Sequence, residues 1–87
     1  MPYIKPNDKL RFAKELEELK SMVMTAGDLN YVITSICKNH LERKNETLCY
    51  SYLNEVIGVL ECAKLEFYRR MVVPYEQLKI EENGDVY

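Results

Sequence analysis

Three polar residues at a regular spacing are the strongest binding-site candidates in this chain of 87 residues. Asn54, Glu61 and Tyr68 are seven residues apart, so on a helix they lie along one side. They border an apolar face, where a buried Asn or Glu needs a hydrogen-bonding partner. The pattern predicts a ligand pocket floored by these groups, with Tyr50 and Tyr68 stacking on a base. The structural alternative is a polar stripe that specifies how helices pair.

Two adjacent arginines follow this stripe. Arg69 and Arg70 come directly after the aromatic pair Phe67 and Tyr68. Guanidinium groups bind phosphate and carboxylate through two parallel hydrogen bonds, so this pair predicts a clamp for a phosphorylated ligand. The structural alternative is that Glu66 pairs with Arg70 one turn later, since residues four apart are neighbours on a helix.

Four carboxylates give a weaker indication of metal chemistry. Glu15, Glu18, Glu55 and Glu61 faintly resemble the set used by all-helical nucleotide pyrophosphohydrolases, which hold Mg²⁺ between facing helices. Those enzymes pair an ExxE element with an ExxD element on a later helix, and no ExxD follows Glu55 or Glu61 within 48–73. A Mg²⁺-dependent hydrolase is therefore the last alternative, and we predict no catalytic residue, metal or cofactor.

The remaining reactive side chains have structural interpretations. His40, the single histidine, falls on an apolar stripe without ligand spacing, which predicts a histidine at the edge of a core. Cys37, Cys49 and Cys62 are odd in number and lack CxxC spacing, which favours reduced thiols. Gly58 in mid-helix costs roughly 1 kcal/mol relative to Ala. Its place one turn before Cys62 predicts a close helix crossing, at a twofold axis between subunits.

Hydrophobic periodicity predicts that three helices position these residues. Apolar side chains recur every three or four residues over about 7–24, 26–43 and 48–73. Asn7 or Asp8 can start the first helix, and the capping box from Thr25 to Asp28 starts the second. Thr47 or Ser51 can cap the third. The fold class is mainly α: a single three-helix domain over 1–87.

The third helix carries more apolar surface than two partner helices would cover. Besides its core-facing stripe it presents a second face, so we expect a homo-oligomer built through this helix. That face consists of Tyr52, Gly58, Val59 and Cys62.

Pro74 predicts a kink or a stop near Val72–Val73, because proline removes a backbone donor. The tail 74–87 then has two interpretations. It can continue as one or two helical turns, or it can form a hairpin at Asn83-Gly84, with Ile80 and Val86 across from each other. Of the two, we predict a short extended or hairpin C-terminal element.

Composition excludes several classes of protein. The formal net charge of −2 provides no general attraction to nucleic acid or to anionic membranes. No apolar run approaches the roughly 20 residues that span a bilayer. The N-terminus lacks the apolar segment of a secretory signal, so we expect a cytoplasmic protein.

Segments along most of the chain resemble a small family of tailed-phage proteins. The segments are LNYVIT (29–34), YLNEVIGVLECAKLEFYRR (52–70), PYE (74–76) and KIEENGDVY (79–87). The resemblance implies a phage accessory protein acting in a bacterial cytoplasm, and it carries no catalytic residues. By analogy with other small phage proteins, it implies counter-defence, in which helical oligomers sequester nucleotide signals.

These observations together predict a non-enzymatic homo-oligomer that binds a phosphorylated small molecule or nucleotide signal. The predicted ligand-binding residues are Tyr50, Asn54, Glu61, Tyr68, Arg69 and Arg70. The alternative is a protein-interaction module that inhibits or recruits a host protein.

Overall fold

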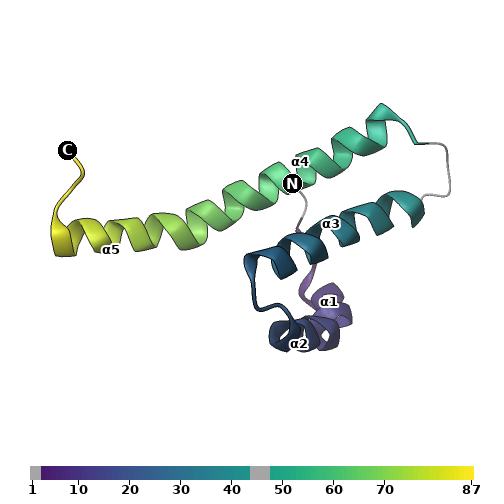
Figure 1. The fold of residues 1–87 in the computed structure, drawn as a ribbon, viewed down its shortest axis with the longest axis horizontal. Coiled ribbons are helices and arrows are strands. Elements are labelled where there is room, and N and C mark those ends of the chain that lie inside the picture. The colour runs from purple at the N-terminus through teal and green to yellow at the C-terminus, as the bar shows by residue number, and fades with distance from the viewer. Residues whose placement is uncertain (1–2, 44–47) are drawn as a thin grey trace. The chain divides into compact units, whose positions relative to one another are not determined.

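The computed structural model describes residues 3–43 and 48–87, and these residues are mainly helical (Figure 1). No strand lies in either range. The predicted mainly α, three-helix fold is confirmed. The chain divides into unit 1 (Met1–Cys49) and unit 2 (Tyr50–Tyr87), and each is described by itself.

The first helical stretch of unit 1 contains α1 (Pro6–Lys9), a 3₁₀ turn η1 (Leu10–Phe12) and α2 (Ala13–Met22). Proline is well suited to the first helical position, because its missing N–H would have no partner there. The Lys5 carbonyl accepts hydrogen bonds from the N–H groups of Asp8 (2.9 Å) and Lys9 (3.2 Å). The helix therefore begins at Pro6 rather than at Asn7 or Asp8.

The predicted capping box opens α3 (Ala26–Arg43). Thr25 Oγ1 accepts from the Asp28 N–H at 3.0 Å, and Asp28 Oδ2 accepts from the N–H groups of Thr25 (3.2 Å) and Met24 (3.0 Å). Because Asp28 holds these donors, Val23 turns extended (ψ 102°) and α2 ends at Met22 rather than at Met24.

The same hydrogen bonds shift the pKa of Asp28. The hydrogen bonds from the backbone of Met24, and then of Thr25, lower its pKa from the ordinary aspartate value. A lowered pKa in the folded state stabilises the fold above the pKa of an unfolded aspartate. That contribution is lost as the pH falls through the folded pKa.

Thr25→Ala is expected to reduce the free energy of unfolding by about 1 kcal/mol, because it removes the side-chain acceptor at the start of α3. Urea denaturation followed by circular dichroism measures the loss. Thr34→Ala is the matched control, since the Thr34 hydroxyl bonds only to carbonyls of its own helix, those of Asn30 (2.8 Å) and Tyr31 (3.1 Å). Equal losses in both variants would contradict the role of the cap.

Unit 2 is one uninterrupted helix, here called the long helix. It runs through α4 (Tyr50–Phe67), a π-helical segment η2 (Tyr68–Val72) and α5 (Val73–Asn83). The predicted kink or stop at Pro74 is replaced by this π segment, in which the Val73 N–H bonds to the Tyr68 carbonyl five residues back. Pro74 is then the second residue of α5, a position where its missing donor is tolerated.

The helical interpretation of the tail holds as far as Asn83. Gly84 ends α5 with φ 84°, a conformation that glycine adopts readily, and its N–H bonds to the Ile80 carbonyl at 2.8 Å. The Asn83-Gly84 signal therefore marks a helix end rather than a hairpin turn. Residues 84–87 have no regular secondary structure, which leaves the extended alternative for the chain end.

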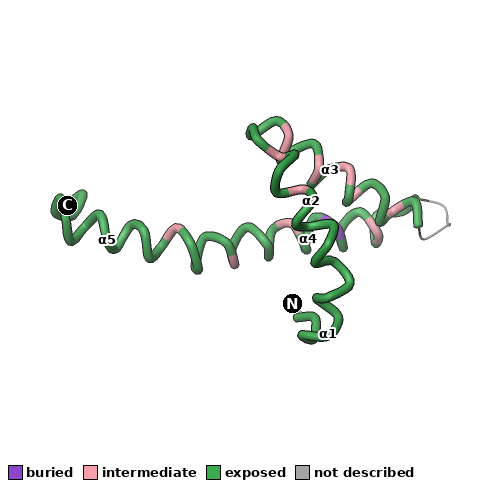
Figure 2. The backbone as a smooth tube through the Cα atoms, turned by 90° about the horizontal axis from the view of Figure 1, so that it is seen from below, coloured by how far each residue is buried: buried purple, intermediate pink, exposed green. Residues whose placement is uncertain are grey.

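Few described side chains are withdrawn from solvent (Figure 2). Val56 on α4 is the buried hydrophobic residue among them, at 9% exposure. Half-buried side chains are Leu19, Val23, Asp28, Val32, Ser35, Cys37, Leu41, Tyr52, Leu60, Glu66 and Val72.

The long helix begins at Tyr50 instead of about 48, and the proposed cap Thr47 lies outside the described residues.

Candidate functional site

The six predicted ligand-binding residues all lie on the long helix, but they form two separate groups. Tyr50 and Arg69 are 19 residues apart. At 1.5 Å per residue the two positions are about 28 Å apart along the helix. A single small ligand therefore cannot contact Tyr50 and the arginines of the same chain at once.

The first group, Tyr50, Asn54 and Glu61, lies along α4 and is open to solvent. Tyr50 and Asn54 are exposed. Glu61 pairs with Lys64 on its own helix, with its carboxylate 3.1 Å from Lys64 Nζ. One helix presents a convex surface, so within unit 2 these side chains border the helix without forming a pocket.

In the second group, both arginines bind one carboxylate. Arg69 Nη2 lies 2.6 Å from Glu66 Oε2, and Arg70 Nε donates to Glu66 Oε1. The Glu66 side chain is only 23% exposed, whereas both arginine side chains are exposed. The pairing within the helix that the sequence left open is therefore present, and it leaves the cluster with one net positive charge.

The Tyr68 hydroxyl already has a partner, because it donates to Glu76 Oε1 at 2.9 Å. This bond spans the π segment, since Tyr68 is its first residue and Glu76 lies on α5. The hydrogen bond, followed by the negative charge of Glu76, raises the pKa of Tyr68 above its ordinary value.

Glu76→Gln is expected to bring the pKa of Tyr68 down towards its ordinary value, because it removes the carboxylate that accepts the hydrogen bond and whose charge opposes ionisation. Spectrophotometric titration of tyrosinate checks this, with Tyr68→Phe identifying the contribution of Tyr68 to the titration curve. With a raised folded pKa, the bond stabilises the fold below the pKa of an unfolded tyrosine, about 10. It stops doing so as the pH rises through the raised value. Unchanged titration in Glu76→Gln would show that the bond is not formed in solution.

Glu76 was not among the predicted site residues, because eight residues separate it from Tyr68 and no common motif has that spacing. In a regular α-helix residues eight apart are rotated by about 80° from each other. The π segment changes that rotation and brings the two side chains to one face. The Glu66 cluster and the Tyr68–Glu76 bond together occupy the π segment and its borders, and π segments inside α-helices are frequent at functional sites.

No part of the described chain gathers three or more His, Cys, Asp or Glu side chains that could hold a metal ion. An ExxD spacing does occur outside 48–73, from Glu82 to Asp85. Both carboxylates have partners: Glu82 binds Lys79 Nζ at 3.1 Å, and Asp85 Oδ1 accepts from the Val86 N–H at 2.6 Å.

In the ranges 3–43 and 48–87, no helix is long and apolar enough to cross a membrane.

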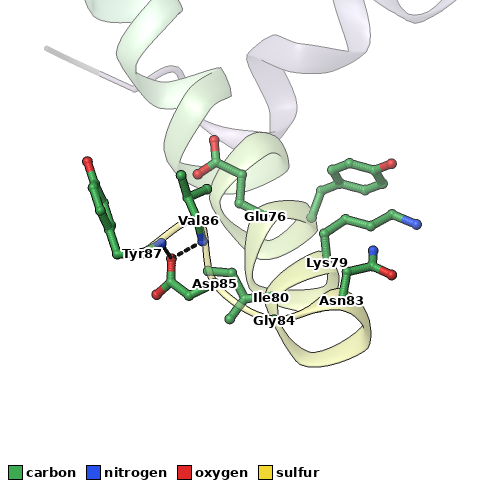
Figure 3. Close-up of a pocket in the computed structure, with 9 residues that line it drawn as sticks. Glu76, Lys79, Ile80, Asn83, Gly84, Asp85, Val86 and Tyr87 are labelled. Carbon is green, nitrogen blue, oxygen red and sulfur yellow. Dashed lines mark hydrogen bonds between the residues drawn. The ribbon is translucent and has the colours of Figure 1, made fainter.

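A hollow of about 500 Å³ lies where residues 84–87 turn back beside α5 (Figure 3). Lys79 contributes to its wall, with Nζ 5.5 Å from the centre of the Tyr75 ring. Val86 and Tyr87, which form the other wall, are themselves exposed. The hollow therefore lacks enclosing packing.

Comparison with known proteins identifies one family. The family described as "Domain of unknown function (DUF6899)" matches residues 1–86. No curated protein and no solved structure matches the chain.

Proposed function

The chain belongs to the DUF6899 family, and we propose that this protein is a non-enzymatic module whose working form is a homo-oligomer assembled along the long helix. One observation carries the proposal: unit 2 is a single helix whose large apolar side chains remain exposed. The most exposed on α4, η2 and α5 include Ile57, Phe67, Met71 and Tyr75.

The physical reason is that a helix cannot cover its own apolar residues. Helices gain most of their stability in proteins from packing an apolar face rather than from propensity. Large exposed apolar patches on soluble proteins mark interaction surfaces. A second copy supplies a matching surface by symmetry.

Sedimentation velocity of the full chain from about 1 to 500 μM tests the proposal, a range that covers the affinities of small interfaces. We expect the sedimentation coefficient to rise with concentration towards that of a dimer or larger species. A protein that remains monomeric across the whole range would overturn the proposal.

A phosphorylated ligand is the second candidate, favoured by the two guanidinium groups that meet at Glu66. Phosphate would replace the Glu66 carboxylate as the bidentate partner of Arg69 and Arg70. Calorimetry with pyrophosphate and with nucleotides tests this. Tighter binding in Glu66→Gln and loss of binding in the Arg69→Gln, Arg70→Gln double variant support this candidate. The absence of binding heat from both the wild type and Glu66→Gln rejects it.

The resemblance to tailed-phage proteins supplies a biological setting for either candidate. In that setting the protein is a phage accessory factor in the bacterial cytoplasm, where sequestration of a nucleotide signal would serve counter-defence. A host protein bound along the same helix is the competing possibility. Purification from host lysate under conditions that retain the oligomer separates nucleotide sequestration from host-protein binding. Only host-protein binding leaves a stoichiometric host protein attached.

A further inference from the structure

The C-terminal half of the long helix carries four large apolar side chains at helical spacing. Phe67, Met71, Tyr75 and Leu78 follow one another at intervals of four, four and three residues. The π segment absorbs one residue, so Phe67 and Tyr75 are at an effective α-helical spacing of about seven residues, and the four side chains lie on one side of the helix. Their exposed fractions are 63%, 59%, 58% and 48%. We call these four residues the C-terminal stripe.

The C-terminal stripe is continuous because the helix does not break at Pro74. The π segment carries the chain from Phe67 to Val73 without leaving helical conformation. The Tyr68–Glu76 bond ties the two sides of that segment together at 2.9 Å. The stripe is therefore held on one continuous helix rather than divided between two.

We propose that a second copy of this chain docks on the C-terminal stripe, with the two long helices antiparallel. This inference rests on the proposed homo-oligomer and specifies its surface. The spacing of the stripe is nearly the same in either direction. An antiparallel partner therefore places its Leu78 against Phe67 and its Tyr75 against Met71, in the isologous arrangement that a twofold axis requires.

Charge favours the antiparallel direction over the parallel one. In a parallel pair, Arg69 and Arg70 of both copies would lie at one level and repel each other. In the antiparallel register that level coincides with Glu76 of the other copy, so opposite charges lie near each other. None of the four stripe residues is charged.

The area available matches a weak self-association. A side chain of this size buries 150–250 Å² when fully covered, so at about 60% exposure each contributes roughly 100 Å². The four residues of both copies then bury about 800 Å², which is below the 1,200 Å² at which standard interfaces begin. We therefore expect a dimer with a dissociation constant on the order of micromolar.

Met71→Glu tests the surface in the full chain, with Leu65→Glu as the matched control. Both residues are exposed on the same helix, at 59% and 46%, but only Met71 belongs to the stripe. A charge buried at the centre of the contact is expected to raise the dissociation constant about 50-fold or more. The control should stay within about threefold of the wild type, as expected for a change outside the interface.

The outcomes separate this inference from the proposed function. A monomeric wild type overturns both. A wild-type dimer that Met71→Glu leaves intact overturns the inference alone. A dimer that Leu65→Glu dissociates also overturns it, and assigns the interface to the neighbourhood of Gly58 and Cys62.

Disulfide trapping tests the direction. The native cysteines are replaced by serine, and Phe67→Cys and Leu78→Cys are prepared separately and oxidised alone or mixed. The antiparallel pair gives a crosslink only in the mixture, because two copies of position 67 would be about 17 Å apart, beyond disulfide reach. Crosslinking of each variant with itself would overturn the antiparallel arrangement.

Discussion

Val56→Asp is expected to lower the free energy of unfolding by about 3 kcal/mol or more, the largest effect we anticipate for one substitution. Val56 is only 9% exposed, so the new carboxylate would lose most of its hydration. Placing an unpaired charge in such an environment is among the most destabilising changes known. Thermal and urea denaturation followed by circular dichroism measure the loss.

Val59→Asp is the matched control for this prediction. It makes the same chemical change three residues later on α4, where the side chain is 53% exposed. We expect a change within about 0.5 kcal/mol when the measurement is made at a concentration that keeps the protein monomeric. Similar losses in both variants would show that the two positions do not differ in burial in solution.

Pro74→Ala is expected to raise the free energy of unfolding by about 1 kcal/mol or more, with the interior proline penalty of ~3 kcal/mol as an upper limit. Alanine restores a backbone donor and lets the helix continue with regular bonding to the residue four back. The π segment would then be lost, and Glu76 would rotate away from Tyr68. The pKa of Tyr68 should therefore fall towards its ordinary value in the same variant.

Gln77→Ala on the same turn of α5 controls for helix propensity alone. It should leave the tyrosine titration unchanged, because it does not alter the hydrogen-bonding pattern around η2. If Pro74→Ala leaves both the stability and the Tyr68 titration at wild-type values, proline does not cause the π segment. The cause would then have to lie in the packing of the long helix.

Short-range chemistry made much of the fold predictable. The second helix was predicted over 26–43 and lies over Ala26–Arg43. Its capping box involves only residues three or four apart, so the partners are adjacent whatever the rest of the chain does. The end of α2 was misplaced by two residues because Asp28 also captures the Met24 N–H, a contact outside the motif.

The candidate site was predictable only in part. Glu66 and Arg70 are four residues apart, so their pairing could be foreseen as an alternative, and it is present. The separation of Tyr50 from the arginines also follows from helix geometry once the helix is known to be continuous. Glu76 could not be foreseen, because its position relative to Tyr68 depends on how the backbone passes Pro74.

The sequence by itself determined the helical class, the capping box and the surplus of apolar residues on the third helix, because these depend on residue type and on neighbours within one turn. The tertiary structure decided whether the helix stops at Pro74, which face α5 presents and which carboxylate accepts from the Tyr68 hydroxyl. Those features depend on the rotation accumulated along the backbone. One extra residue in the π turn resets that rotation for every side chain that follows it.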